Sequence, residues 1–124
     1  MRRNLFVIVI VVIVAASLLL LRQSMAAEGT AIRGEVVETY CWGALQIGGA
    51  GHAKCGIECV RRGIPAAIYD AQSRKAFVLL PGRDKASLPP ELIAAMGRKV
   101  IVRGDVLNRG GTAFVTVRSW ELQR

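Results

Sequence analysis

The distribution of hydrophobic and polar positions divides the chain into two parts. Residues 5–21 form the run LFVIVIVVIVAASLLLL, in which Ser17 is the one polar residue and no residue is charged. Beyond residue 30, short runs rich in β-branched and aromatic residues alternate with stretches rich in glycine and proline. The first pattern is typical of a signal or membrane-spanning segment. The second predicts a domain of short strands joined by turns.

Five strands and two short helices are predicted beyond residue 30. In the fourth and fifth strands, alternate valines mark one apolar face, which is typical of antiparallel strands with one dry side. The second helix starts with prolines and ends at Gly97, as short helices often do. The predicted strands cover residues 31–40, 64–70, 74–81, 98–107 and 112–122, and the predicted helices cover 52–63 and 88–97.

The order of these elements predicts a mainly β (α+β) fold. Without residues 41–63, the order is three strands, a helix and two strands, which is the order of an OB-fold, a five-stranded antiparallel barrel. An open α+β sandwich is the alternative. In an OB-like barrel, residues 41–63 become a helical insert in the first loop, near the fourth loop at residues 108–111, and these two loops usually carry the ligand.

The N-terminal apolar run predicts export of the rest of the chain. Its seventeen residues fit a short membrane-spanning helix better than the shorter core of a signal peptide. Cleavage after Ser24-Met25-Ala26 is the alternative, and the mature protein would then be periplasmic or secreted. Arg2 and Arg3 are expected to stay in the cytoplasm. The predicted parts are a cytoplasmic segment 1–4, an anchor or uncleaved signal 5–22, a linker 23–30 and an exported domain 31–124.

The charge of the exported part narrows its expected partners. From residue 28 onward, 14 lysines and arginines face nine acidic residues, a net charge of +5. A basic domain often binds nucleic acid, but an exported domain does not meet it, and these strands offer few aromatic residues for stacking on bases. Simple solubility is the plainest explanation of this charge. Among partners, anionic lipid headgroups or an acidic protein fit it better than nucleic acid, and we expect the inner membrane and a larger membrane protein complex. Arg61 and Arg62, at the end of a predicted helix, are the candidate contact residues.

All three cysteines and the only histidine lie between residues 41 and 59. On a helix, His52, Cys55 and Cys59 would project within about 60° of arc, and Cys41 could add a fourth ligand from the preceding loop. Three cysteines and one histidine suit zinc, and thiolates with one imidazole also suit copper(I). Covalent haem is not expected, because the Cys-x-x-Cys-His spacing is missing. The pattern predicts a zinc or copper site formed by these four residues.

A disulfide is the structural alternative to the metal site. Exported domains lie in an oxidising compartment, where Cys41 could pair with Cys55 or Cys59. One thiol would remain unpaired, and this odd count favours metal over a purely structural disulfide. Thiol redox chemistry is a third interpretation of the same three cysteines.

The remaining polar and aromatic residues predict no catalytic centre. The chain has no recognisable serine triad, phosphate-binding loop or carboxylate dyad. We expect Glu35, Glu38 and Glu58 to be solvated or paired in salt bridges. Trp42 is expected to be a core or rim aromatic residue, and Met96 is expected to pack in the core.

The segment from Gly34 to about Ile68 resembles small exported bacterial proteins of unassigned function. The resemblance rests on a strand that ends in cysteine, a glycine-rich loop, and the residues Cys41, His52, Cys55, Cys59, Gly63 and Pro65. It implies a periplasmic, membrane-associated protein encoded with respiratory or metalloenzyme components, and it brings no known reaction.

Together these observations predict a membrane-anchored, single-pass protein of the bacterial inner membrane with a metal-binding periplasmic domain. We expect it to serve as an accessory subunit or a metal-handling factor of a membrane enzyme complex, not as an enzyme itself. A disulfide-stapled interaction module without metal and a thiol redox protein are the two alternatives.

Overall fold

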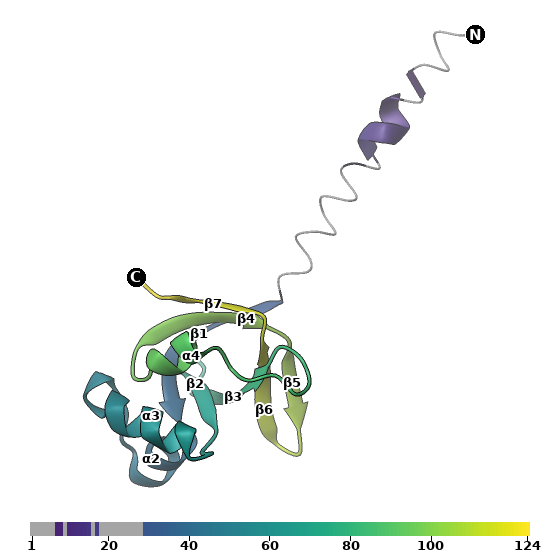
Figure 1. Cartoon of the computed structure of the whole chain (residues 1–124). Helices are drawn as coiled ribbons and strands as arrows, with labels where there is room; N and C mark the ends of the chain where they lie inside the picture. Colours follow the sequence, from purple (N-terminus) through teal and green to yellow (C-terminus); the bar gives the residue numbers. More distant parts are fainter. Residues whose placement is uncertain (1–6, 9, 16, 18–28) are drawn as a thin grey trace.

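The computed structural model describes residues 7–8, 10–15, 17 and 29–124 (Figure 1). Half of the anchor expected at residues 5–22 lies outside these residues, as do the whole cytoplasmic segment 1–4 and the cleavage site. Within the described part, no helix has both the length and the apolar character needed to cross a membrane.

The domain is built around a seven-stranded mixed sheet in the order β5-β6-β3-β2-β1-β4-β7. Strands β3 and β6 pair in parallel, and the other neighbours pair antiparallel. The strands are β1 (Thr30–Glu38), β2 (Ala66–Asp70), β3 (Lys75–Pro81), β4 (Lys99–Gly104), β5 (Val106–Arg109), β6 (Thr112–Val117) and β7 (Ser119–Leu122). The helices are α2 (Thr39–Leu45), the 3-10 helix η1 (Ala50–His52), α3 (Ala53–Arg61) and α4 (Pro90–Ala94).

The mainly β fold with added helices is confirmed, but the five-stranded antiparallel barrel is not, because the sheet has seven strands and one parallel pair. Each of the last two predicted strands is divided, one at Asp105 and the other at Arg118. The two interruptions lie side by side, since the Thr116 amide donates to the Asp105 carbonyl at 3.0 Å. A Cβ on Gly104 would lie 1.5 Å from the Thr116 carbonyl oxygen, so only glycine allows this approach.

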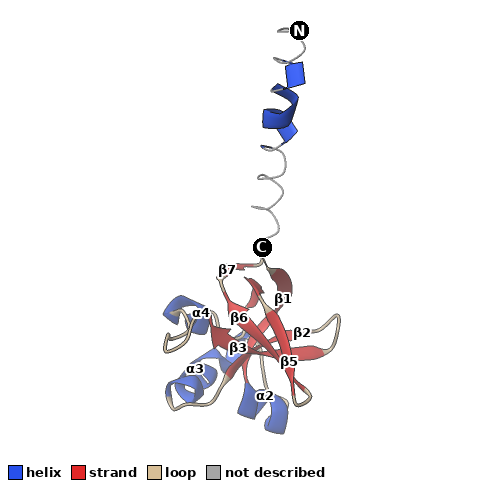
Figure 2. Cartoon of the chain, turned by 90° about the vertical axis from the view of Figure 1, so that its right-hand side faces the viewer, coloured by secondary structure: helices blue, strands red, loops and turns tan. Residues whose placement is uncertain are grey.

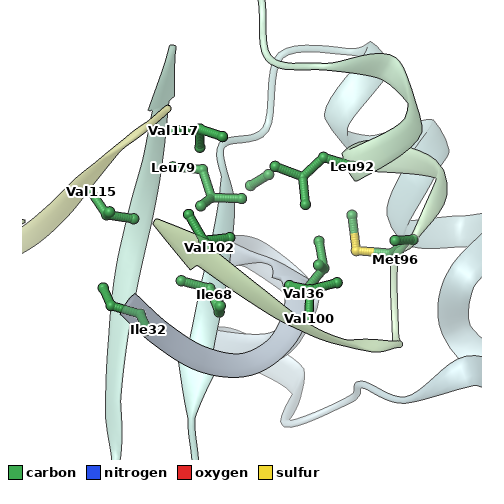
Figure 3. Packing of buried hydrophobic residues seen from close by; sticks show 12 residues of the cluster. Ile32, Val36, Ile68, Leu79, Leu92, Met96, Val100, Val102, Val115 and Val117 are labelled. Atoms are coloured by element: carbon green, nitrogen blue, oxygen red, sulfur yellow. The ribbon is translucent and has the colours of Figure 1, made fainter. Parts of the chain in front are cut away.

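The core lies between the curved sheet and the helices α3 and α4. Figure 3 shows side chains from several strands meeting Leu92 of α4 and, at one edge, Met96. Met96 is 3% exposed, which confirms that it packs in the core. The buried cluster consists of Ile32, Val36, Ala66, Ile68, Leu79, Leu92, Ala95, Met96, Val100, Val102, Val115 and Val117.

Helices α2 and α3 lie together at one end of the domain, while β7 and the C-terminus lie at the other (Figures 1 and 2). The predicted helix at 52–63 is present as α3, which packs Ala53, Ile57 and Val60 against the core. The loop predicted at 41–51 was partly wrong, because its first residues belong to α2. Four glycines in this segment indicated a loop, but only Gly43 lies inside α2, and the cap described below outweighs its low helix propensity.

Candidate metal centre

Glu38, which was expected to be solvated or paired in a salt bridge, is the residue that organises the site. It is the last residue of β1 and the N-cap of α2, and it is 2% exposed. Its Oε1 accepts a hydrogen bond from the Cys41 amide at 2.6 Å, and its Oε2 accepts one from the Tyr40 amide at 2.9 Å. The carboxylate thereby satisfies amides at the start of α2 and turns Cys41 toward the interior.

The three cysteines form one cluster from two helices. The sulfur atoms of Cys41, Cys55 and Cys59 all lie within 4.8 Å of one another. Cys55 and Cys59 are four residues apart on α3, so they lie on one side of that helix. Thiolates on a tetrahedral zinc ion, with Zn–S bonds of about 2.3 Å, have sulfurs about 3.8 Å apart. Small side-chain movements would therefore place one ion among these sulfurs.

The three thiols differ in how deeply they are buried. Cys41 is buried, Cys59 is half-buried and Cys55 is exposed, and all three are free thiols. The cluster is therefore anchored in the interior at Cys41 and open to solvent at Cys55.

His52 belongs to a second group that overlaps the first. Its Nε2 lies 3.9 Å from Glu38 Oε1, and the ligand atoms of Glu38, Cys41 and His52 lie within 4.8 Å of one another. The predicted set of four is thus divided into two groups that share Cys41. The reason is that α3 begins at Ala53 and His52 ends a 3-10 turn, so the α-helical periodicity does not extend back to the histidine.

The His52 ring places an unsatisfied nitrogen inside the protein. Nε2 is buried and has no hydrogen-bond partner among the described residues. A cavity of about 10 Å³, lined in part by Glu38, His52 and Met96, lies beside it. This volume is close to the smallest that holds one water molecule. A buried nitrogen without a partner is costly, and an ion or a water molecule bound there would remove the cost.

Close packing of α3 holds the two groups together. A Cβ on Gly56 would lie 2.8 Å from Met96 Cγ, 3.1 Å from Met96 Sδ and 3.5 Å from Glu38 Cγ. Glycine at this position therefore lets the helix that carries Cys55 and Cys59 approach the buried carboxylate.

The environment keeps two of the thiols protonated. The hydrogen bond from the Cys41 thiol to Glu38, together with burial and the nearby carboxylate charge, raises the pKa of Cys41 to about 12. Burial, followed by the charges of Cys55 and Glu38, raises the pKa of Cys59. These shifts make Cys41 a poor nucleophile at neutral pH. A bound cation supplies the positive charge that would let both thiols ionise.

Of the other residues singled out in the sequence, some lie on the surface and one lies in the site. Arg61 and Arg62 are exposed at the end of α3. Arg62 donates to Glu58 at 2.9 Å, which confirms the salt bridge expected for Glu58. Glu38 is buried, so it is not solvated, and its ion-pair neighbour is His52, whose Nε2 lies 3.9 Å from Oε1. The signal available in the sequence was a carboxylate three residues before Cys41, which is the spacing of a helix cap.

Comparison of the chain with family models, curated proteins and solved structures finds no match.

Proposed function

We propose that the domain binds one soft metal ion, zinc or copper, through Cys41, Cys55 and Cys59. The observation that carries the proposal is the mutual approach of the three sulfurs within 4.8 Å. Cys41 and the α3 cysteines are separated along the chain and come together only through folding. Thiolates are preferred ligands of zinc and copper(I).

His52 is the best candidate for a fourth ligand. Both oxygens of Glu38 already accept backbone hydrogen bonds, so the carboxylate is committed to capping α2. The His52 Nε2 is buried and unpartnered in the described part of the chain, and it shares Cys41 with the thiol cluster. Movement of the ring toward the sulfurs of Cys55 and Cys59 would complete a Cys3His set. Glu38 then positions the ligands and does not bind the ion.

The proposed setting is the periplasmic face of the bacterial inner membrane. Support comes from the apolar run at residues 5–21 and from the basic character of the part that follows it. In this setting the domain acts as an accessory subunit or a metal-handling factor of a membrane enzyme complex. The exposed Arg61 and Arg62 are suitable contacts for an acidic partner or for lipid headgroups.

An OB-like barrel remains part of the proposal. If β4 with β5 and β6 with β7 are counted as two bent strands, the domain has five. The hydrogen bond between Arg118 and the Arg103 carbonyl, at 2.9 Å, joins the two bends and supports that description.

The same proximity of sulfurs also favours one alternative, a disulfide. Sulfur atoms within 4.8 Å need to approach to about 2.05 Å to form the bond. A Cys41–Cys59 or Cys41–Cys55 bond would join α2 to α3 covalently, giving a stapled interaction module without metal. Exposed Cys55 would be the residue for thiol redox chemistry, the third interpretation.

Metal analysis combined with thiol counting on the full chain tests the proposal. The protein is purified from membranes without chelators, its metal content is measured, and free thiols are titrated after denaturation. One zinc or copper ion per chain with three free thiols supports the metal site. Absence of metal with a single free thiol contradicts it and supports the disulfide. R61A, which changes an exposed residue of the same helix, is the control and should bind metal like the unchanged protein.

A further inference from the structure

A second candidate site lies where α2 and the glycine-rich loop after it meet strands β1 and β2. It is a surface hollow of about 410 Å³. Glu35, Trp42, Gln46, Gly48 and Tyr69 are among its lining residues. No cysteine and no histidine lines it, so it contains none of the candidate metal ligands, although it shares Glu35, Gly48 and Gly49 with the small cavity beside His52. The inference does not depend on the metal proposal.

Three elements build the hollow. Glu35 of β1 and Tyr69 of β2 are direct cross-strand partners, so their side chains emerge on the same face of the sheet. Trp42 of α2 lies over Tyr69, with ring centroids 4.8 Å apart and ring planes inclined by 45°. The result is a carboxylate placed beside two aromatic rings.

A glycine keeps the carboxylate accessible. A Cβ on Gly48 would lie 3.0 Å from Glu35 Oε1 and 3.9 Å from Trp42 Cδ1, so a larger residue would crowd both. The Gly49 amide donates to Oε1 of Glu35 and fixes the orientation of the side chain. Oε2 of Glu35 accepts no hydrogen bond from the residues that the structure describes, which leaves it free to accept one from a ligand.

The geometry points to the binding of an organic cation, an ammonium or guanidinium group, in this hollow. Aromatic faces attract such groups through their quadrupoles, and a fixed carboxylate adds a charged hydrogen-bond acceptor. The lining residues include no lysine or arginine, although residues 29–124 contain 14 of them against eight acidic residues. The hollow is therefore a local acidic and aromatic site on a basic domain. Its volume accommodates the end of a lysine or arginine side chain or a small free amine.

Fluorescence of Trp42 reports directly on this site. In the W120F variant of the full chain, Trp42 is the one remaining tryptophan. The probes are Nα-acetyl-arginine methylamide, Nα-acetyl-lysine methylamide, methylammonium and guanidinium, with acetate as an anion of similar size. The titrations are made with chelator and again with zinc. We expect the cations to change the Trp42 emission in a saturable way at about millimolar concentration, and acetate to leave it unchanged.

Variants of two carboxylates test whether Glu35 binds the cation. E35Q keeps a carbonyl that can accept from the Gly49 amide and removes the charge, so we expect cation binding to weaken about tenfold with an unchanged melting temperature. E121Q removes an exposed carboxylate on β7 and should bind cations like the parent. Equal binding by E35Q and the parent, absence of saturation, or an equal response to acetate would overturn the inference.

The capped amino acids and the free ions identify the source of the cation. Tighter binding of the capped arginine or lysine indicates a side chain of a protein partner. Equal binding of methylammonium or guanidinium indicates a small free amine. Either outcome leaves the metal proposal untouched, because metal content is measured separately.

Discussion

The interior of the sheet and the helical end of the domain are stabilised by different kinds of interaction. The interior of the sheet is a purely apolar cluster, in which Ile68, Leu92 and Val102 are completely buried. The end formed by α2 and α3 instead buries the Cys41 thiol together with the Glu38 carboxylate and the His52 imidazole nitrogen, and a small cavity lies beside the last two groups. Buried polar groups stabilise a fold only when they are partnered. We therefore expect the apolar part to fold without a bound ion, whereas the helical end should gain order when an ion binds.

The largest expected effect comes from the apolar part. L92A removes a fully buried side chain from the cluster and should lower the free energy of unfolding by about 2–5 kcal/mol. Urea denaturation of the full chain measures it, and the loss should be the same with zinc and with chelator. L107A, which shortens an exposed side chain, is the matched control and should have little effect. A loss that disappears when zinc is added would mean that the two regions are not independent.

The second largest effect is expected on zinc affinity when His52 is replaced. H52A should weaken zinc binding by about 10- to 100-fold, because it removes either a ligand or the group closest to the ligands. A competition titration with a chromophoric chelator measures the change. Unfolding with chelator present should be changed little or even favourably, since the variant removes an unpartnered buried nitrogen. K54A, an exposed neighbour on α3, should bind zinc normally, and unchanged affinity in H52A would leave a three-thiolate site.

A somewhat smaller effect on stability is expected when Glu38, the N-cap of α2, is replaced. E38A removes the acceptor of the Tyr40 and Cys41 amides and should cost about 1–2 kcal/mol of stability with chelator present. The same change removes the main cause of the raised pKa of Cys41, so this thiol should ionise nearer its ordinary value. Thiolate absorbance during a pH titration follows the ionisation. E58A, which removes an exposed carboxylate, should change neither quantity, and an unchanged Cys41 pKa in E38A would contradict the role given to Glu38.

The smallest effect is expected in the exposed turn after β2. The Ser73 hydroxyl and the backbone amides of the turn hold the pKa of Asp70 below its ordinary value. A lowered pKa in the folded state means that the contribution is present above the unfolded pKa and is lost as pH falls through the folded one. S73A should therefore slightly reduce stability at neutral pH, with the difference vanishing in acid. Urea midpoints measured from pH 7 to pH 2 test this, and S119A is the control.

The sequence predicted most strands because their signal is local. Alternating valines and turn residues placed β2, β3 and the two C-terminal hairpin segments close to their observed positions. The divisions at Asp105 and Arg118 escaped prediction, because a bend inside an apolar run depends on a neighbouring strand. Helix α2 also escaped prediction, because its first residues and its cap lie in the segment 31–40, whose β-branched and aromatic residues indicated a strand.

The sequence alone determined how candidate ligands are arranged within a single helix. Cys55 and Cys59 share a side of α3 because they are four residues apart on a helix, and the odd number of cysteines made metal more attractive than a disulfide. The tertiary structure alone decided that Cys41 meets them, that His52 belongs to a second group, and that Glu38 lies at the centre. These contacts join segments whose relative positions depend on strand pairing and packing across the whole domain, and no local pattern records such distances.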